Sequence, residues 1–215
     1  MKRLLLAPIL VLILITMTGC GDDHRNEPQL FFTQILSNAA LDGDIERNPA
    51  AGTLTITQGN TESVFVGVDP VTGTEFRAFL DFSLTGAGGV PLNAIINSAT
   101  LNISINNLDP RTATIPIRID LISFAPPTLL GDDFDRTLQP ALATTTIQPP
   151  IGPADFGQNV AIDITSLMVE AQRLGLPTLQ LRLLPDSPIL GLVEINDTTG
   201  VNRGILAPLL EVEYF

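Results

Sequence analysis

The chain has few of the side chains on which most enzyme and metal chemistry depends. Its 215 residues include one cysteine, one histidine, one tyrosine and no tryptophan. A single cysteine excludes an intramolecular disulfide. The single histidine, His24, lies in a polar segment near the N-terminus, so we expect neither a hydrolase triad nor a histidine-based zinc site. The lack of tryptophan also argues against a strong aromatic platform for sugars.

Positive charge is scarce as well. The 11 lysines and arginines face 23 aspartates and glutamates, which gives a net charge of −12. Without residues 1–19, which contain Lys2 and Arg3, the balance becomes 11 − 2 = 9 against 23, or −14. A surface of this sign repels phosphate backbones. Nucleic acid is therefore not an expected partner.

The first 20 residues have the pattern of an export signal. Lys2 and Arg3 precede an almost wholly apolar stretch of about 14 residues, shorter than the roughly 20 needed to span a bilayer. The stretch ends in Met17-Thr18-Gly19-Cys20, which resembles the lipobox of bacterial lipoproteins. In that family the cysteine is diacylated and becomes the new N-terminus. The alternative is a plain secretory signal that is cleaved at another small residue.

This pattern predicts the domain organisation and the location. Residues 1–19 are expected to be a removed signal peptide, and residues 20–29 a flexible tether from lipidated Cys20. Residues 30–215 suit one domain. We expect an exported protein that is anchored to a cell-envelope membrane by its lipid. Because Gly21 rather than an aspartate follows the cysteine, the outer membrane is favoured over the inner membrane.

Most of the chain alternates apolar and polar residues with a period of two. In the run 76–83 the even positions are apolar and the odd positions are mostly polar. Such alternation is typical of half-buried antiparallel strands. Equivalent runs lie at 53–57, 62–68, 99–106, 115–121, 160–164, 179–183, 190–196 and 210–214. The pattern therefore predicts about nine strands.

Three further features complete the predicted fold. Pro116 lies inside its run, which indicates an edge strand because proline has no N–H for the ladder. A helix is expected over 166–174, capped by Thr165 and ended by Gly175. Segment 125–156 is rich in proline, glycine and aspartate and predicts long loops. The expected fold class is all-β: an antiparallel two-sheet jelly-roll β-sandwich with one short helix near 166–174.

Four segments follow the order of a known domain signature. They read FRAFLDFSL at 76–84, INSATL at 96–101, VAIDITSL at 160–167 and PLLEVEY at 208–214. Taken together they resemble DNRLRE-type domains over about residues 53–215. The resemblance implies a jelly-roll sandwich of bacterial and archaeal surface proteins. It also implies, as in some relatives, a carbohydrate-binding module for alginate-like or other acidic glycans.

Two groups of residues are candidates for binding. Arg77, Phe79 and Asp81 share one face of a predicted strand, where charged groups could hold sugar hydroxyls beside a stacking ring. The alternative is that they form cross-strand pairs. Asp132, Asp133 and Asp135 cluster in a predicted loop and are candidate oxygen ligands for a structural calcium ion. The alternative is a solvated, turn-forming loop. No other cofactor is expected.

The sequence leaves three functional hypotheses. The first is a non-catalytic lipoprotein whose sandwich is an interaction or structural module, with the membrane and an envelope protein as partners. The second is a carbohydrate-binding module for a cell-surface or environmental polysaccharide. The third is a glycan-cleaving enzyme that uses two carboxylates, drawn from Asp132, Asp133, Asp135, Glu194 and Asp197. We expect no enzyme, and therefore no catalytic residues.

Overall fold

The computed structural model describes residues 29–124 and 128–215. The predicted signal peptide, Cys20 and nearly all of the predicted tether therefore lie outside the described residues. Within the described ranges, no helix has both the length and the apolar character needed to cross a membrane.

The described residues form twelve strands, three short α-helices and one turn of 3-10 helix. The elements in chain order are β1 (Phe31–Leu36), β2 (Gly43–Arg47), β3 (Leu54–Gln58), β4 (Ser63–Val68), β5 (Glu75–Ser83), β6 (Ile96–Asp109), β7 (Ile117–Ile122), α2 (Gly131–Phe134), β8 (Ala143–Thr146), η1 (Pro153–Asp155), β9 (Asn159–Asp163), α3 (Thr165–Leu174), β10 (Thr178–Pro185), β11 (Gly191–Asn196), α4 (Arg203–Leu206) and β12 (Leu209–Tyr214).

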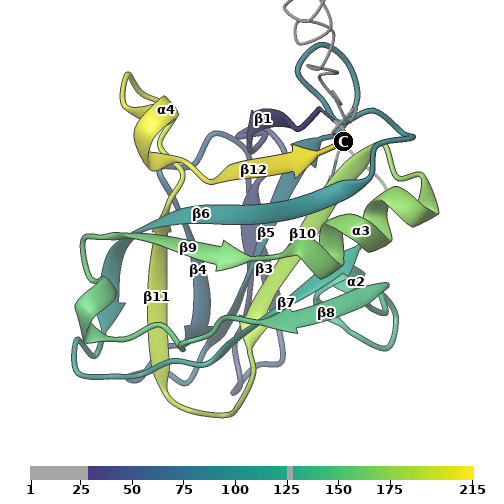
Figure 1. Ribbon diagram of the computed structural model, residues 1–215. Coiled ribbons are helices and arrows are strands. Elements are labelled where there is room, and N and C mark those ends of the chain that lie inside the picture. The colour runs from purple at the N-terminus through teal and green to yellow at the C-terminus, as the bar shows by residue number, and fades with distance from the viewer. Residues whose placement is uncertain (1–28, 125–127) are drawn as a thin grey trace, which may run out of the picture.

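The strands form a curled antiparallel sheet that folds into two layers (Figure 1). The hydrogen-bonded path runs β1-β12-β6-β11-β4-β5-β10-β7-β8, while β9 pairs with β6, and β2 pairs with both β3 and β5. The long strand β6 joins the layers, because its first part pairs with β12 and β9 and its last part pairs with β11. The predicted all-β, antiparallel sandwich is confirmed.

The main core lies between the two layers. Alternate residues of the central strands point into it, and Leu80, Leu101 and Leu181 are examples with no exposed surface. Burying a side chain of this size stabilises the fold by about 1.5–3 kcal/mol relative to leaving it in water. The period-two pattern of the sequence therefore identified the residues that hold the layers together.

The strand predictions were correct for the regular runs and wrong at three short strands and one proline. Strands β1, β2 and β8 were not predicted. Pro116 precedes β7 rather than lying inside it, and β7 is not an edge, because it pairs with both β10 and β8. The edge position belongs to β8, whose short sequence Ala143–Thr146 has too few apolar residues to show a pattern.

Helix α3 lies where it was predicted, although its cap differs. Leu167 and Met168 are fully buried, and Gly175 ends the helix in the left-handed conformation, with φ 65°, which glycine adopts without strain. Thr165 does not cap the helix with its side chain. Its hydroxyl oxygen instead accepts a hydrogen bond from the Ala99 N–H, 3.0 Å away, and so ties the start of the helix to β6.

Candidate functional site

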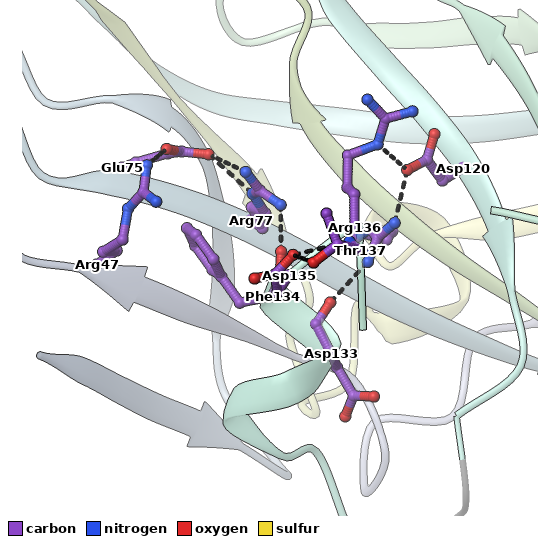
Figure 2. Close-up of polar contacts among 10 residues, drawn as sticks. Arg47, Glu75, Arg77, Asp120, Asp133, Phe134, Asp135, Arg136 and Thr137 are labelled. Atoms are coloured by element: carbon purple, nitrogen blue, oxygen red, sulfur yellow. Dashed lines mark hydrogen bonds and ion pairs between the residues drawn. The ribbon is translucent and has the colours of Figure 1, made fainter. Parts of the chain in front are cut away.

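The segment 128–139, which contains α2, packs against the layer that holds β5 and β10. Figure 2 shows its residues 133–137 beside Arg77 and Asp120. Arg182 of β10 lies beneath this segment with no exposed surface. Its guanidinium donates to Oδ2 of Asp120, 2.8 Å away, and to the carbonyl oxygen of Asp133, 2.7 Å away. Asp120 is equally buried and also accepts from Nε of Arg136, 3.2 Å away. These buried charges bind the segment to the sheet.

Phe134 lies between two further arginines of the same region (Figure 2). The Cζ atoms of Arg77 and Arg47 are 3.9 Å and 5.0 Å from the centre of its ring, a geometry that attracts a cation to an aromatic face. Arg77 also donates to the Phe134 carbonyl oxygen, and both arginines pair with Glu75. Burial lowers the pKa of Arg77, and Glu75 opposes this shift. Arg47, Arg77, Arg136 and Arg182 are called the arginine cluster below.

Two members of the predicted sugar-binding trio, Arg77 and Phe79, lie against this segment. Phe79 has no exposed surface and packs edge-on against Phe124, with 6.3 Å between ring centres. Asp81 is also buried and accepts from Nε2 of Gln180, 3.1 Å away. Only Arg77 keeps some exposure. The prediction that Phe79 offers a ring to a sugar is therefore wrong, because a second small core covers that face.

The three carboxylates of the predicted calcium site do not converge. Asp133 accepts from the Leu130 N–H, 2.7 Å away, and thereby closes the first turn of α2. Asp135 accepts from the N–H and the hydroxyl of Thr137, while Asp132 is exposed. Among the described residues no group of three acidic, cysteine or histidine side chains is placed to hold a metal ion. Calcium binding by this loop stays a prediction.

A second region lies on the opposite face of the β2–β3 hairpin. Successive residues of a strand point to opposite sides. Ile45 and Arg47 therefore lie on the side of the arginine cluster, to which Arg47 belongs, while Asp44 and Glu46 point away from it. There they border a groove of about 500 Å³, called the acidic groove below. Its lining residues are Asp44, Glu46, Thr57, Thr61, Glu62, Ser63, Phe65, Phe76 and Glu194.

The carboxyl group of Asp44 is buried at the wall of the acidic groove. Its Oδ2 accepts a hydrogen bond from the Phe65 N–H, 3.3 Å away. Burial raises the pKa of Asp44 to about 7, with a further contribution from the charge of Glu46, although the hydrogen bond from Phe65 opposes the rise. Near neutral pH this group therefore exists both as a proton donor and as an acceptor.

The other groove residues supply hydrogen-bond acceptors and an apolar surface. Glu194 accepts from the hydroxyl of Ser63, 2.7 Å away. The rings of Phe65 and Phe76 lie 5.9 Å apart at 54° and are partly exposed. None of the residues that line the groove, all of them in the described part of the chain, is basic. Acceptors beside aromatic rings can bind the hydroxyls and the apolar face of a sugar.

A third acidic group is buried next to the acidic groove, where Thr61 of the groove donates to Asp197. Asp42 and Asp197 have no exposed surface. Asp197 pairs with Arg203, 3.3 Å away, and its charge acts on the carboxyl group of Asp42. Burial and the charge of Asp197 raise the pKa of Asp42 to about 8, and burial also raises the pKa of Asp197. This pair joins the start of β2 to the end of β11 and α4.

Volume and ion pairing distinguish the candidate sites. Ligand pockets usually measure about 300–1,000 Å³. The hollow beside Arg47, Phe134 and Arg136 measures about 200 Å³, and its arginines already have internal partners. Another hollow of about 400 Å³ lies between the β4–β5 and β10–β11 loops, but its charged residues are likewise paired. The acidic groove is therefore the best candidate site.

The chain matches no protein-family model and no curated protein. The resemblance to DNRLRE-type domains therefore stays a prediction.

Sequence reasoning did not single out the acidic groove. In the sequence Glu194 is a carboxylate beside a strand end, and no motif marks Asp44, Phe65 or Phe76 as site residues. Alternation along β4 places Phe65 on the polar side of its strand, which was a usable signal. The wall of the groove that the β2–β3 hairpin supplies could not be predicted from the sequence, because β2 itself was not predicted.

Proposed function

We propose that the chain is a lipid-anchored module outside the cytoplasm, and that its sandwich binds a partner rather than converting a substrate. One observation carries the binding part of this proposal. The acidic groove combines a ligand-sized volume with hydrogen-bonding groups and partly exposed rings. The anchor rests on the sequence around Cys20, where an apolar export signal ends in a lipobox-like tetrapeptide.

The anchor is tested by the mass and partitioning of the mature chain. Expressed in a bacterium with lipoprotein processing, the chain should lose residues 1–19 and gain the mass of acyl groups on Cys20. It should then enter the detergent phase, because each buried CH₂ contributes about 0.8 kcal/mol to lipid insertion. The Cys20→Ser variant should remain aqueous. A mature N-terminus at another residue without added lipid would contradict the anchor.

A saccharide is the ligand class that the groove chemistry favours, as in the carbohydrate-binding hypothesis. Carboxylates accept hydrogen bonds from sugar hydroxyls, and the groove's own hydroxyls both donate and accept them. The rings of Phe65 and Phe76 offer an apolar surface. Asp44, Glu46, Glu62 and Glu194 make the groove acidic. Like charges repel, so neutral or amino-bearing glycans suit it better than the acidic glycans that the family resemblance implies.

Glycan binding is tested with the mature chain on a panel of neutral, amino-bearing and acidic polysaccharides, with calcium and with a chelator. The proposal predicts binding to a neutral or amino-bearing glycan without release of product. Binding lost only in the chelator would assign calcium to the complex. Steady release of sugars would instead support the glycan-cleaving hypothesis. If no glycan binds, crosslinking in the cell envelope would test a protein partner.

A further inference from the structure

Six large apolar side chains are exposed at the corner where the described chain begins. Phe32 and Ile95 are 58% and 70% exposed, far more than a core position allows. The full set is Leu30, Phe31, Phe32, Leu92, Ile95 and Phe215, called the terminal patch below.

Backbone pairing and a ring contact bring Phe31, Ile95 and Phe215 together from distant parts of the sequence. The backbones of Ile95 and Phe215 exchange two hydrogen bonds, of 3.0 and 3.1 Å. Phe31 lies opposite Tyr214 in the β1–β12 pairing, and their rings stack with 5.7 Å between centres. In Figure 1 the C-terminus and the first strand lie at the same end of the molecule. Phe31 and Phe32 are successive strand residues and point to opposite sides of β1, which is an edge strand. Exposed apolar residues gathered around such an edge often mark a contact site.

We infer that the terminal patch rests on the lipid surface to which the chain is anchored, as a second membrane contact. This inference rests on the proposed lipidation of Cys20. Residues 20–29 span at most about 35 Å when fully extended, and they end directly beside Leu30. The anchor therefore keeps the terminal patch close to the bilayer. Because the effective concentration of lipid at the patch is high, even a weak contact forms.

The charges around the patch specify the kind of lipid. Glu213 lies opposite Phe32 in the β1–β12 pairing, and Glu211 lies opposite Gln34. These carboxylates repel anionic headgroups. The occupant is therefore a zwitterionic lipid surface, into whose interfacial region phenylalanine and leucine side chains insert.

The absence of tryptophan from the chain permits a direct test. The Phe32→Trp variant, in the full lipidated protein, places one fluorophore in the terminal patch. The Val71→Trp variant is the matched control, since Val71 is 88% exposed and lies in the β4–β5 loop. This loop borders the β10–β11 loop, which lies at the end of the sandwich away from the C-terminus (Figure 1). Both proteins are reconstituted into phosphatidylcholine vesicles, with and without bromine on the acyl chains.

The inference predicts a blue-shifted emission for Phe32→Trp, with most of the signal lost in brominated vesicles. The control should emit as in water and keep its signal. Equal emission from the two variants, with lipidation verified by mass, would overturn the inference and leave the proposed anchor intact. A blue shift that bromine does not quench would assign the patch to a second copy of the chain. An unlipidated mature chain would overturn both proposals.

Discussion

The two faces of the β2–β3 hairpin differ in what they contact. One face carries Ile45 and Arg47 and lies against the arginine cluster, where the positive charges are paired and most of the surface is covered. The other carries Asp44 and Glu46 and borders the open acidic groove. Both faces carry charged side chains, because the residues of β2 point alternately to one face and to the other. What separates them is whether another segment of the chain covers the face.

The covered face shows how this acidic protein uses its few arginine side chains. Arg182 and Asp120 are both fully buried, and the arginine also holds a main-chain oxygen of the segment above it. A buried ion pair contributes little net stability, but removing one partner leaves an uncompensated buried charge. The arginine cluster therefore has a structural role, whereas the open acidic groove is the proposed binding site.

The largest expected effect is the loss of the buried carboxylate in Asp120→Asn. The variant leaves Arg182 charged and without its ion-pair partner, and should lower the free energy of unfolding by about 3–5 kcal/mol. Its matched control is Asp186→Asn, which breaks the partly exposed pair with Arg118 and should cost about 0–1 kcal/mol. Urea unfolding measures both. Equal losses of unfolding free energy in the two variants would mean that the arginine cluster does not hold segment 128–139 on the sheet.

The next effect is a fall in stability with rising pH that originates on the groove side. Burial raises the pKa of Asp44 to about 7 and that of Asp42 to about 8. The folded state therefore binds more protons than the unfolded state between about pH 4 and 8, and stability is lost as pH rises through this window. The shift of Asp44 corresponds to about 4 kcal/mol at most.

Asp44→Asn isolates this contribution, because the amide resembles the protonated acid and does not titrate. Urea unfolding at pH 5 and pH 8.5 should show a smaller difference for the variant than for the native chain. Native stability that increases between these pH values would show that Asp44 and Asp42 are not protonated in the fold.

The sequence predicted the core better than it predicted the site, for a physical reason. Burial between two layers repeats every second residue, so runs such as 99–106 are visible without a structure. Coverage of an outer face depends on a segment that arrives from elsewhere, and 128–139 has no periodicity. Arg77, Phe79 and Asp81 were thus correctly grouped on one strand face, but that face proved to be covered.

The acidic groove was missed for a related reason. It forms where β4, β11 and the β2–β3 hairpin meet, and no one of these segments carries the whole set of groups. Asp44 and Glu194 are distant in the sequence, and their local surroundings resemble ordinary polar strand positions. Only the three-dimensional pairing of strands brings them to one surface.

The central claim is that the acidic groove binds a ligand and that the arginine cluster only supports the fold. Glycan titration of two surface variants tests it most directly. Glu194→Gln lies in the groove, and Arg136→Gln lies at the exposed rim of the arginine cluster. Calorimetry against the glycan selected from the panel should show strongly reduced affinity for Glu194→Gln and native affinity for Arg136→Gln. Native affinity in Glu194→Gln together with lost affinity in Arg136→Gln would contradict the account.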